Sequence, residues 1–225
     1  MTAFAALPEL YVSPAAGQGL RADAARLAAW DLTAEQTAEL ALMMDGGLFP
    51  LRGYLSQADH QAVLADGRLA SGMVWPLPLA LAVPDGLAAE LEPGQDIALR
   101  EPGGAVLAIM SVTDIWGAGP ALLGGRIKGL AAPRGRDAAL TPNALRARFR
   151  AAGCRQVLAE LGAGGVMLRP DRGEPVALPL AVESALGQAI LARNHGATHL
   201  LLPEDAAARR LLCAHADGLG LDPVG

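Results

Sequence analysis

Cysteine, lysine and aromatic residues are scarce in this chain of 225 residues, and each shortage excludes a class of protein. The two cysteines, Cys154 and Cys213, are too few for a disulfide framework, so we expect a reducing compartment, the cytoplasm. Lys128 is the only lysine among 18 basic residues, and the net charge of −5 argues against a dedicated nucleic-acid-binding protein. Aromatic residues make up 4% of the chain, so Leu, Ala and Val must fill the core.

Long hydrophobic runs are missing as well. The longest apolar run, from Val74 to Val83, contains Pro76 and Pro78 and is far shorter than the roughly 20 residues of a membrane-spanning helix. The first residues lack the basic segment of a signal peptide, so we expect neither export nor membrane insertion. What is present is a hydrophobic fraction of 52% with 18% charged residues, which is typical of a folded chain with one large or two small domains.

The first 135 residues predict a mixture of helices and strands. Thr33 and Gln36 have the spacing of a capping box, which predicts a helix that ends at Asp45-Gly46-Gly47. Residues 1–30 are expected to be irregular or rich in β structure. The other expected elements are a short helix from Ser56 to Asp66, a strand at 79–83, strands at 96–100 and 105–112 joined by a turn, and a β domain that buries Trp75 and Trp116.

The last 90 residues predict a different organisation. Residues 117–136 show no clear periodicity, and we expect a domain boundary near residue 135. Beyond it strands and helices alternate, which predicts a small parallel α/β unit over 136–225. Its expected elements are a helix opened by Thr141-Pro142, strands at 157–158 and 166–168, a helix over Ala181–Asn194, a strand at 199–202, and a last helix opened by Pro203-Glu204-Asp205.

A family resemblance begins between Met43 and Leu55, which read Met-Met-Asp-Gly-Gly-Leu-Phe-Pro-Leu-Arg-Gly-Tyr-Leu. This segment resembles the N-terminal domain of the ATP sulfurylase (sulfate adenylyltransferase) family. Similar residues continue in order to about residue 155, and the resemblance returns from Ala189 to His199. It implies an α+β protein: a PUA-like β domain with added helices over 1–135, then a shortened, Rossmann-like remnant of the nucleotidyltransferase domain over 136–225.

The resemblance breaks where the family carries its chemistry. After Ala159 the family has a Gln-x-Arg-Asn-Pro-x-His-x-x-His motif that holds sulfate and the nucleotide phosphates. This chain has Glu160-Leu161-Gly162-Ala163-Gly164-Gly165 there, and no His-x-x-His occurs in it. Joining sulfate to ATP needs fixed cationic and N–H donors around two anions. We therefore predict no catalytic residues and a non-catalytic or auxiliary role in sulfate activation. The alternative is a divergent nucleotidyltransferase that makes adenosine phosphosulfate and pyrophosphate.

The late block of similarity indicates where a ligand would bind. The family's nucleotide loop aligns with residues 203–208, of which only Asp205 and Ala207 match. Together with Arg193 and Asn194 they are the predicted nucleotide- or anion-binding residues, and ATP or adenosine phosphosulfate is the expected ligand. No cofactor is required by this hypothesis. No metal site is predicted, because Cys213-x-His215 is not a usual zinc spacing.

Two further patterns leave alternatives open. The glycines at 162, 164 and 165 favour a hairpin turn over a phosphate-binding loop, because the Lys-Ser/Thr of a P-loop is missing. Six arginines form one basic cluster, at positions 134, 136, 146, 148, 150 and 155. Since PUA-like domains elsewhere bind RNA, an RNA-binding module is a third hypothesis, although a solvated helix face is favoured. The expected partners are a second copy of the chain or a sulfate-activation enzyme such as an adenylylsulfate kinase.

Overall fold

The computed structural model describes residues 4–179 and 182–225. The chain divides into two compact units, and neither is one continuous stretch. The N-terminal unit consists of residues 8–64 and 78–136, and the C-terminal unit of residues 1–7, 65–77 and 137–225. The predicted domains 1–135 and 136–225 remain a prediction.

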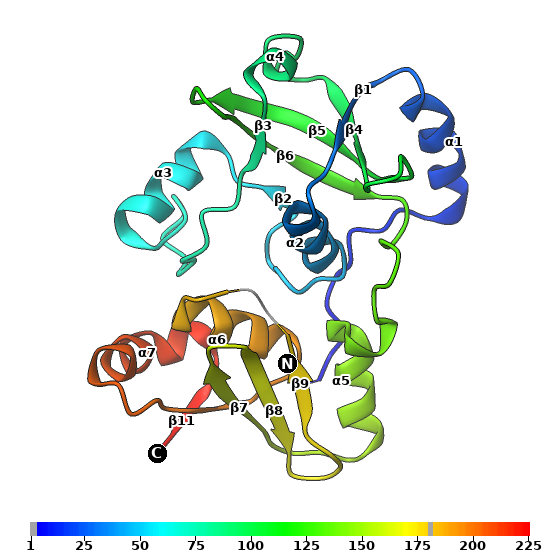
Figure 1. Cartoon of the computed structure of the whole chain (residues 1–225). Helices are drawn as coiled ribbons and strands as arrows, with labels where there is room; N and C mark the ends of the chain where they lie inside the picture. The colour runs from blue at the N-terminus through cyan, green and yellow to red at the C-terminus, as the bar shows by residue number, and fades with distance from the viewer. Residues whose placement is uncertain (1–3, 180–181) are drawn as a thin grey trace. The chain divides into compact units, whose positions relative to one another are not determined.

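The N-terminal unit is built on a six-stranded sheet (Figure 1). Its strands run in the order β1-β4-β5-β6-β2, with β3 also paired to β6. Only the pair of β1 and β4 is parallel among the described strand pairs of this sheet, and the others are antiparallel. The strands are β1 (Ala28–Asp31), β2 (Gly53–Tyr54), β3 (Leu81–Val83), β4 (Asp96–Arg100), β5 (Val106–Trp116) and β6 (Ala121–Gly129).

Four helices accompany this sheet in the described residues: α1 (Pro14–Ala24), α2 (Ala34–Met44), α3 (Gln57–Asp66) and α4 (Asp85–Ala88). The predicted capping box of α2 is confirmed, because the Gln36 amide donates to Thr33 Oγ1 at 3.2 Å and the Thr33 amide donates to Gln36 Oε1 at 3.1 Å. Leu40, Met43 and Met44 of α2 are buried, as the helical spacing predicted. The predicted helix before Asp66 and the paired strands around residue 100 are confirmed as well.

Two predictions for the N-terminal unit missed an element. The expectation of an irregular or β-rich segment over residues 1–30 missed α1, which begins at Pro14 after the Ser13 side chain caps its first turn, whereas the other described residues of this segment are irregular or in strands. The stretch 117–136 contains β6, whose glycines weakened the strand pattern. A Cβ atom on Gly125 would lie 2.3 Å from the Ser111 carbonyl oxygen, so close backbone packing requires glycine at this position.

The C-terminal unit contains a five-stranded sheet in the order β11-β10-β7-β8-β9. The prediction of a parallel sheet is correct only for β7, β10 and β11, because β8 runs antiparallel to both β7 and β9. The predicted hairpin turn explains this, since only Ala163 and Gly164 separate β7 from β8. The elements are α5 (Pro142–Ala151), β7 (Val157–Gly162), β8 (Gly165–Pro170), β9 (Val176–Leu178), α6 (Ala185–Asn194), β10 (His199–Leu201), α7 (Ala206–Leu219) and β11 (Asp222–Val224). The predicted α6 start, Ala181, lies outside the described residues.

Two segments distant in sequence complete the C-terminal unit. Phe4 packs on Phe149 of α5 with ring centroids 5.9 Å apart. Its carbonyl oxygen accepts a hydrogen bond from Arg150 at 2.9 Å. Trp75, expected in the β domain, belongs instead to this unit, where it is 1% exposed. Its indole N–H donates to the Leu77 carbonyl at 2.9 Å.

Candidate functional site

A pocket of about 380 Å³ lies in the C-terminal unit at the carboxyl ends of β7 and β10. Ligands of open α/β sheets bind at this edge. The helices α6 and α7 both begin there, so their N-terminal N–H groups point toward the same edge. The lining residues are Leu161, Gly162, Ala163, Glu183, Ala185, Gln188, Pro203 and Ala208.

Side chains of this chain already accept hydrogen bonds from backbone N–H groups at the start of both helices beside the pocket. Ser184 Oγ accepts from the Gly187 amide at 3.3 Å, and Asp205 Oδ1 accepts from the Ala208 amide at 2.7 Å. Gln188, which is 5% exposed, donates to the carbonyl oxygens of Gly162 at 2.9 Å and Val182 at 2.7 Å. Gln188 therefore ties the end of β7 to the start of α6.

The charge around this pocket disfavours anions. Glu183 lines it, and Asp205 caps the adjoining helix, whereas none of the described lining residues is Lys or Arg. A carboxylate at a helix N-terminus already uses the favourable dipole that a phosphate or sulfate would need. The arrangement can accept neutral or cationic groups better than a triphosphate.

The four predicted ligand residues lie in two separate places. Asp205 and Ala207 stand at the start of α7, beside the pocket. Arg193 and Asn194 stand at the other end of α6, a helix of 10 residues that spans about 15 Å. Arg193 Nη1 donates to the Leu219 carbonyl at 3.5 Å, so both helices end at the same edge, away from the pocket. The structure therefore does not bring the four residues into one cluster, and their contact with a ligand remains a prediction.

Arg193 and Asn194 take part in a buried polar arrangement with Arg146 of α5. Arg146 donates from Nε to the Asn194 carbonyl and from Nη2 to the Arg193 carbonyl, both at 2.8 Å, and from Nη1 to the Ala5 carbonyl at 3.0 Å. Burial, with a smaller contribution from the charge of Arg193, lowers the pKa of Arg146 to about 10. Burial also lowers the pKa of Arg193. A guanidinium at a helix C-terminus is favourable, so this cluster stabilises the end of α6.

Gln188 and Arg146 were not among the predicted site residues. Each occupies a position on the apolar stripe of its helix: Gln188 lies three residues before Leu191 and four before Ala192, and Arg146 lies three residues before Phe149. A polar residue on an apolar stripe is a signal of a buried hydrogen-bonding role. That signal was available in the sequence.

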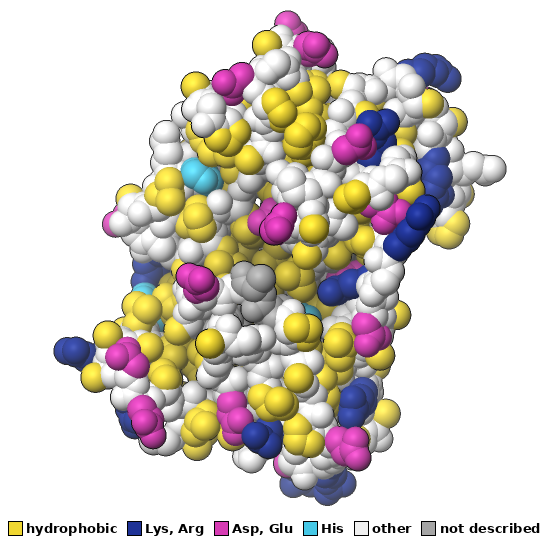
Figure 2. Space-filling view, in the orientation of Figure 1, with side chains coloured by type: hydrophobic (Ala, Val, Ile, Leu, Met, Phe, Trp, Pro, Cys, Tyr) yellow, Lys and Arg dark blue, Asp and Glu magenta, His cyan; other side chains and the backbone are white. Residues whose placement is uncertain are grey.

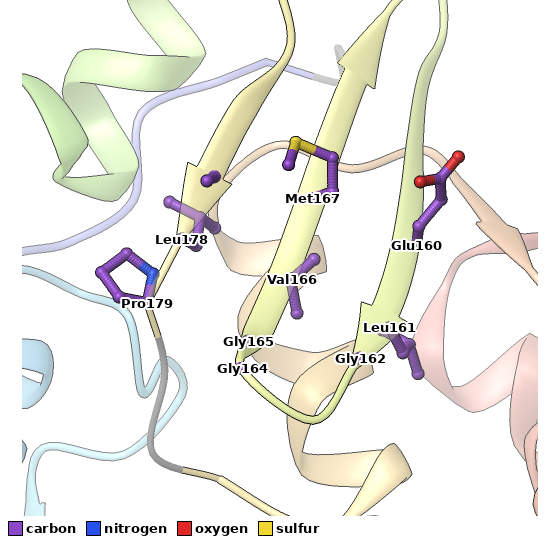
Figure 3. A pocket seen from close by; sticks show the side chains of 10 residues that line it. Glu160, Leu161, Gly162, Gly164, Gly165, Val166, Met167, Leu178 and Pro179 are labelled. Carbon is purple, nitrogen blue, oxygen red and sulfur yellow. The ribbon is translucent and has the colours of Figure 1, made fainter.

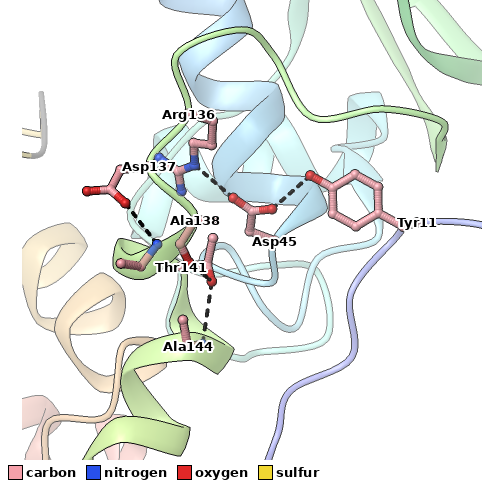
Figure 4. A network of polar contacts seen from close by, with 8 residues as sticks. Tyr11, Asp45, Arg136, Asp137, Ala138, Thr141 and Ala144 are labelled. Carbon is pink, nitrogen blue, oxygen red and sulfur yellow. Dashed lines mark hydrogen bonds and ion pairs between the residues drawn. The ribbon is translucent and has the colours of Figure 1, made fainter.

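The arginine cluster is not a solvated face throughout. Arg134 pairs with Glu101 at 3.0 Å and Arg136 with Asp45 at 2.8 Å. Tyr11 donates to the same Asp45 carboxylate at 2.8 Å (Figure 4). With Arg146 and Arg150 bonded to backbone carbonyls, most of the cluster is engaged within the chain. This use of the arginines disfavours the RNA-binding hypothesis.

A second buried polar pair lies in the N-terminal unit. Burial raises the pKa of Glu39 to about 7. Tyr54, 4% exposed, also has a raised pKa, chiefly because of burial and then because of the charge of Glu39. We therefore expect the stability of this unit to change with pH as Glu39 titrates.

Comparison with known families decides the identity of the first part of the chain. Residues 2–123 match the model of the PUA-like domain family, which is more than half of the 225 residues. The chain belongs to the PUA-like domain family. The expected α+β class with a PUA-like domain is thereby confirmed.

Several sulfate adenylyltransferases are similar to this PUA-like family member. The sulfate adenylyltransferase of Symbiobacterium thermophilum is 44% identical over 91 residues, which are 40% of this chain and 23% of that protein. The sulfate adenylyltransferase of Kluyveromyces lactis is 41% identical over 90 residues, which are 40% of this chain and 18% of that protein. The expected resemblance is confirmed, and the match spans only about a fifth of these relatives' length.

A solved structure resembles nearly the whole chain. The hexameric APS kinase from Thiobacillus denitrificans superposes with a TM-score of 0.79 at 25% sequence identity. The match covers 97% of this chain and 55% of that chain. The likeness therefore includes both units of the PUA-like family member.

Three features of the described residues concern metals, thiols and membranes. No group of three or more His, Cys, Asp or Glu side chains in the described part could hold a metal ion. Cys154 is buried and Cys213 is exposed, and both are free thiols. Among the described helices, none is both long and apolar enough to cross a membrane.

Proposed function

We propose that this chain is a sulfate adenylyltransferase-like protein of sulfate activation that does not itself join sulfate to ATP. The observation that carries the proposal is the pocket at the ends of β7 and β10. Its described lining contains Glu183 and no cationic side chain, and the helix starts around it are capped by Ser184 and Asp205.

The chemistry explains why this pocket argues against turnover. Sulfate would have to attack the α-phosphate of ATP, so two anions must be held in contact while charge develops on the leaving pyrophosphate. Fixed cations and N–H donors supply that stabilisation in phosphoryl transfer. Glu183 lines this pocket, and its negative charge opposes the binding of anions there.

An auxiliary role beside an adenylylsulfate kinase is the form of the proposal that the comparisons favour. The region that resembles this chain makes up 55% of the solved chain, whose title is hexameric APS kinase. We propose that this chain provides the equivalent region as a separate subunit. It would associate in an oligomer with an adenylylsulfate kinase or with a complete sulfate-activation enzyme.

The direct test measures pyrophosphate release from ATP, sulfate and Mg²⁺, coupled to inorganic pyrophosphatase. The Kluyveromyces lactis sulfate adenylyltransferase is the positive control, and the same mixture without sulfate is the blank. We expect the chain to match the blank. Sulfate-dependent release that disappears in the Gln188→Ala variant would refute the proposal and establish the divergent nucleotidyltransferase instead.

The partner part of the proposal has its own test. The chain is mixed with purified adenylylsulfate kinase, and complex formation is followed by sedimentation velocity. Co-sedimentation with a changed kinase KM supports the auxiliary role. Independent sedimentation of both proteins at about 100 µM, with unchanged kinase kinetics, contradicts it.

A further inference from the structure

Two polar side chains meet at the pocket beside the start of α6. Ser184 is the N-cap of this helix, so Glu183 directly precedes the cap and Gln188 is the fourth helical residue. In many helices these two positions hold apolar side chains that pack on each other. Here both residues line the pocket of about 380 Å³, and both carry hydrogen-bond acceptors. Positions that usually make an apolar contact therefore present polar atoms to a cavity.

The orientation of the Gln188 amide is fixed by its partners. Nε2 donates to the carbonyl oxygens of Gly162 at 2.9 Å and Val182 at 2.7 Å, which uses both of its protons. Because a carbonyl oxygen can only accept, the amide cannot turn over, and Oε1 is the atom that remains.

This oxygen is an acceptor that the fold leaves without a donor. In the part of the chain that the structure describes, no group donates a hydrogen bond to Oε1, although Gln188 is only 5% exposed. Oε1 is not one of the fully enclosed polar atoms, so it is accessible from the pocket that Gln188 lines. A buried acceptor without a donor costs free energy, so a donor that enters the pocket is favoured.

The charge at the pocket selects the kind of donor. The N-terminal ends of α6 and α7 each carry about half a positive charge, about one in total. Glu183 and Asp205 carry one negative charge each and outweigh them. Arg209 and Arg210 of α7 are exposed and do not line the pocket, so water screens their charges there. The balance favours a cation that can donate hydrogen bonds.

The attraction is local, and the walls are apolar. On the face of the molecule in Figure 2, acidic side chains lie scattered among basic and hydrophobic ones, without a broad acidic patch. Glu160 points away from Leu161 and pairs with Arg169 at 2.6 Å (Figure 3). The pocket itself is lined by Leu161, Pro203 and Ala208, against which an apolar stem can pack.

We propose that this pocket binds a primary ammonium group on a short apolar stem, from a small amine or from a lysine side chain of a partner protein. The ammonium group has three donors and no acceptor, so it can donate to Gln188 Oε1 and pair with the Glu183 carboxylate. The volume equals that of about a dozen water molecules, which leaves room for a stem of about four carbons. The proposal rests on the same pocket as the proposed function and adds a ligand class to it.

The test titrates the isotope-labelled full chain with butylammonium chloride in about 0.1 M NaCl and follows backbone amides by two-dimensional NMR. We expect saturable shifts at Gly162, Ala163 and Ala185 with a Kd of about 1 mM, as for other very small ligands. Butyrate and butanol should bind at least about tenfold more weakly, because they lack the positive charge. Butyltrimethylammonium keeps the charge but has no N–H donor, so equal binding of this probe would contradict the role of Oε1.

A matched pair of variants locates the site. Glu183→Gln keeps the size of the side chain and should raise the Kd for butylammonium about tenfold. Glu204→Gln changes the net charge equally at an exposed residue that does not line the pocket, so the Kd should stay within about twofold. An unchanged Kd in Glu183→Gln, with circular dichroism showing a folded chain, overturns the proposal. So does the absence of saturable shifts at about 20 mM butylammonium in the wild-type chain.

A second probe, N-acetyl-lysine methylamide, distinguishes the two sources of the ammonium group. Tighter binding than that of butylammonium supports the site as one for a partner's lysine, and weaker binding supports it as one for a free amine. Neither ATP nor sulfate is present in these titrations. Their failure therefore leaves the pyrophosphate test unaffected, and sulfate-dependent pyrophosphate release would refute the proposed function without changing the amine titration.

Discussion

The two units reach the folded state by different means. The N-terminal unit buries the apolar side chains of neighbouring antiparallel strands, among them Ile97, Ile109 and Leu123. The C-terminal unit needs Phe4 and Trp75 from distant segments and a buried arginine, Arg146, to finish its core. The β4-β5-β6 meander in the N-terminal sheet is thus stabilised by strands that follow one another in sequence, whereas the three-segment unit depends on side chains from distant segments.

The largest expected effect comes from removing the distant segments, because they complete the core of the C-terminal unit. A fragment of residues 137–225 lacks both Phe4 and Trp75 and should show no cooperative thermal transition by circular dichroism. A fragment of residues 8–136 retains its whole sheet and should unfold cooperatively. Cooperative unfolding of the 137–225 fragment would show that the inserted segments are dispensable.

Truncating a single side chain, Trp75, should cause much of the same loss of stability. Trp75→Ala removes a side chain that is 1% exposed, and the expected loss in the free energy of unfolding is about 3–5 kcal/mol. Urea denaturation followed by circular dichroism measures it. Trp116→Ala is the matched control, because Trp116 is only partly buried against His60 and should cost less. Equal losses for the two variants would contradict the comparison.

The polar part of the C-terminal core is tested through Arg146. Arg146→Ala leaves the carbonyl groups of Ala5, Arg193 and Asn194 without this donor, so we expect a loss of about 2–4 kcal/mol in urea denaturation. Arg148→Ala on the exposed side of the same helix should change stability by less than about 0.5 kcal/mol. A small effect at both positions would mean that the arginine is not needed to hold α6.

The smallest expected effect concerns pH and the N-terminal unit. Burial raises the pKa of Glu39 to about 7, so the unfolded chain loses this proton at lower pH than the folded chain does. Stability from this group is therefore greatest below its ordinary pKa and falls as pH rises to about 7, by up to about 2–3 kcal/mol. Urea midpoints at pH 5 and pH 8 measure the difference.

Glu39→Gln should flatten that dependence. Glu35→Gln is the control, because Glu35 is exposed and hydrogen bonds lower rather than raise its pKa. If the wild-type chain and the Glu39→Gln variant show the same change in urea midpoint, Glu39 does not titrate as its burial indicates.

Local signals in the sequence identified much of the fold. The caps Thr33, Thr141 and Asp205 mark helix starts, because a cap involves only the three or four residues beside it. The β6 strand was missed, since Gly124 and Gly125 are required by contacts with Leu55 and Ser111 elsewhere in the chain. Such non-local requirements leave no periodic pattern.

The candidate site shows the same limit. The sequence predicts that Arg193 lies near the end of one helix and Asp205 opens the next, but not how these two helices run relative to each other. The direction of α6 and α7 places them at opposite edges of the sheet. The sequence predicted a carboxylate, Glu160, where the family binds anions, but Glu160 pairs with Arg169, and the acidic residue that lines the pocket is Glu183. The role of Gln188 depends on the contact between α6 and the end of β7.

The docking of residues 4–7 on α5 has a consequence for synthesis on the ribosome. Leu7 and its partner Asn143 are separated by 136 residues. At about 5–20 residues per second, the segment waits roughly 10–30 s for its partner to be made. During that interval Phe4 has no core to enter, because α5 and the rest of the C-terminal unit have not yet been made. Nascent chains should therefore expose this segment to chaperones and proteases until α5 has left the ribosome.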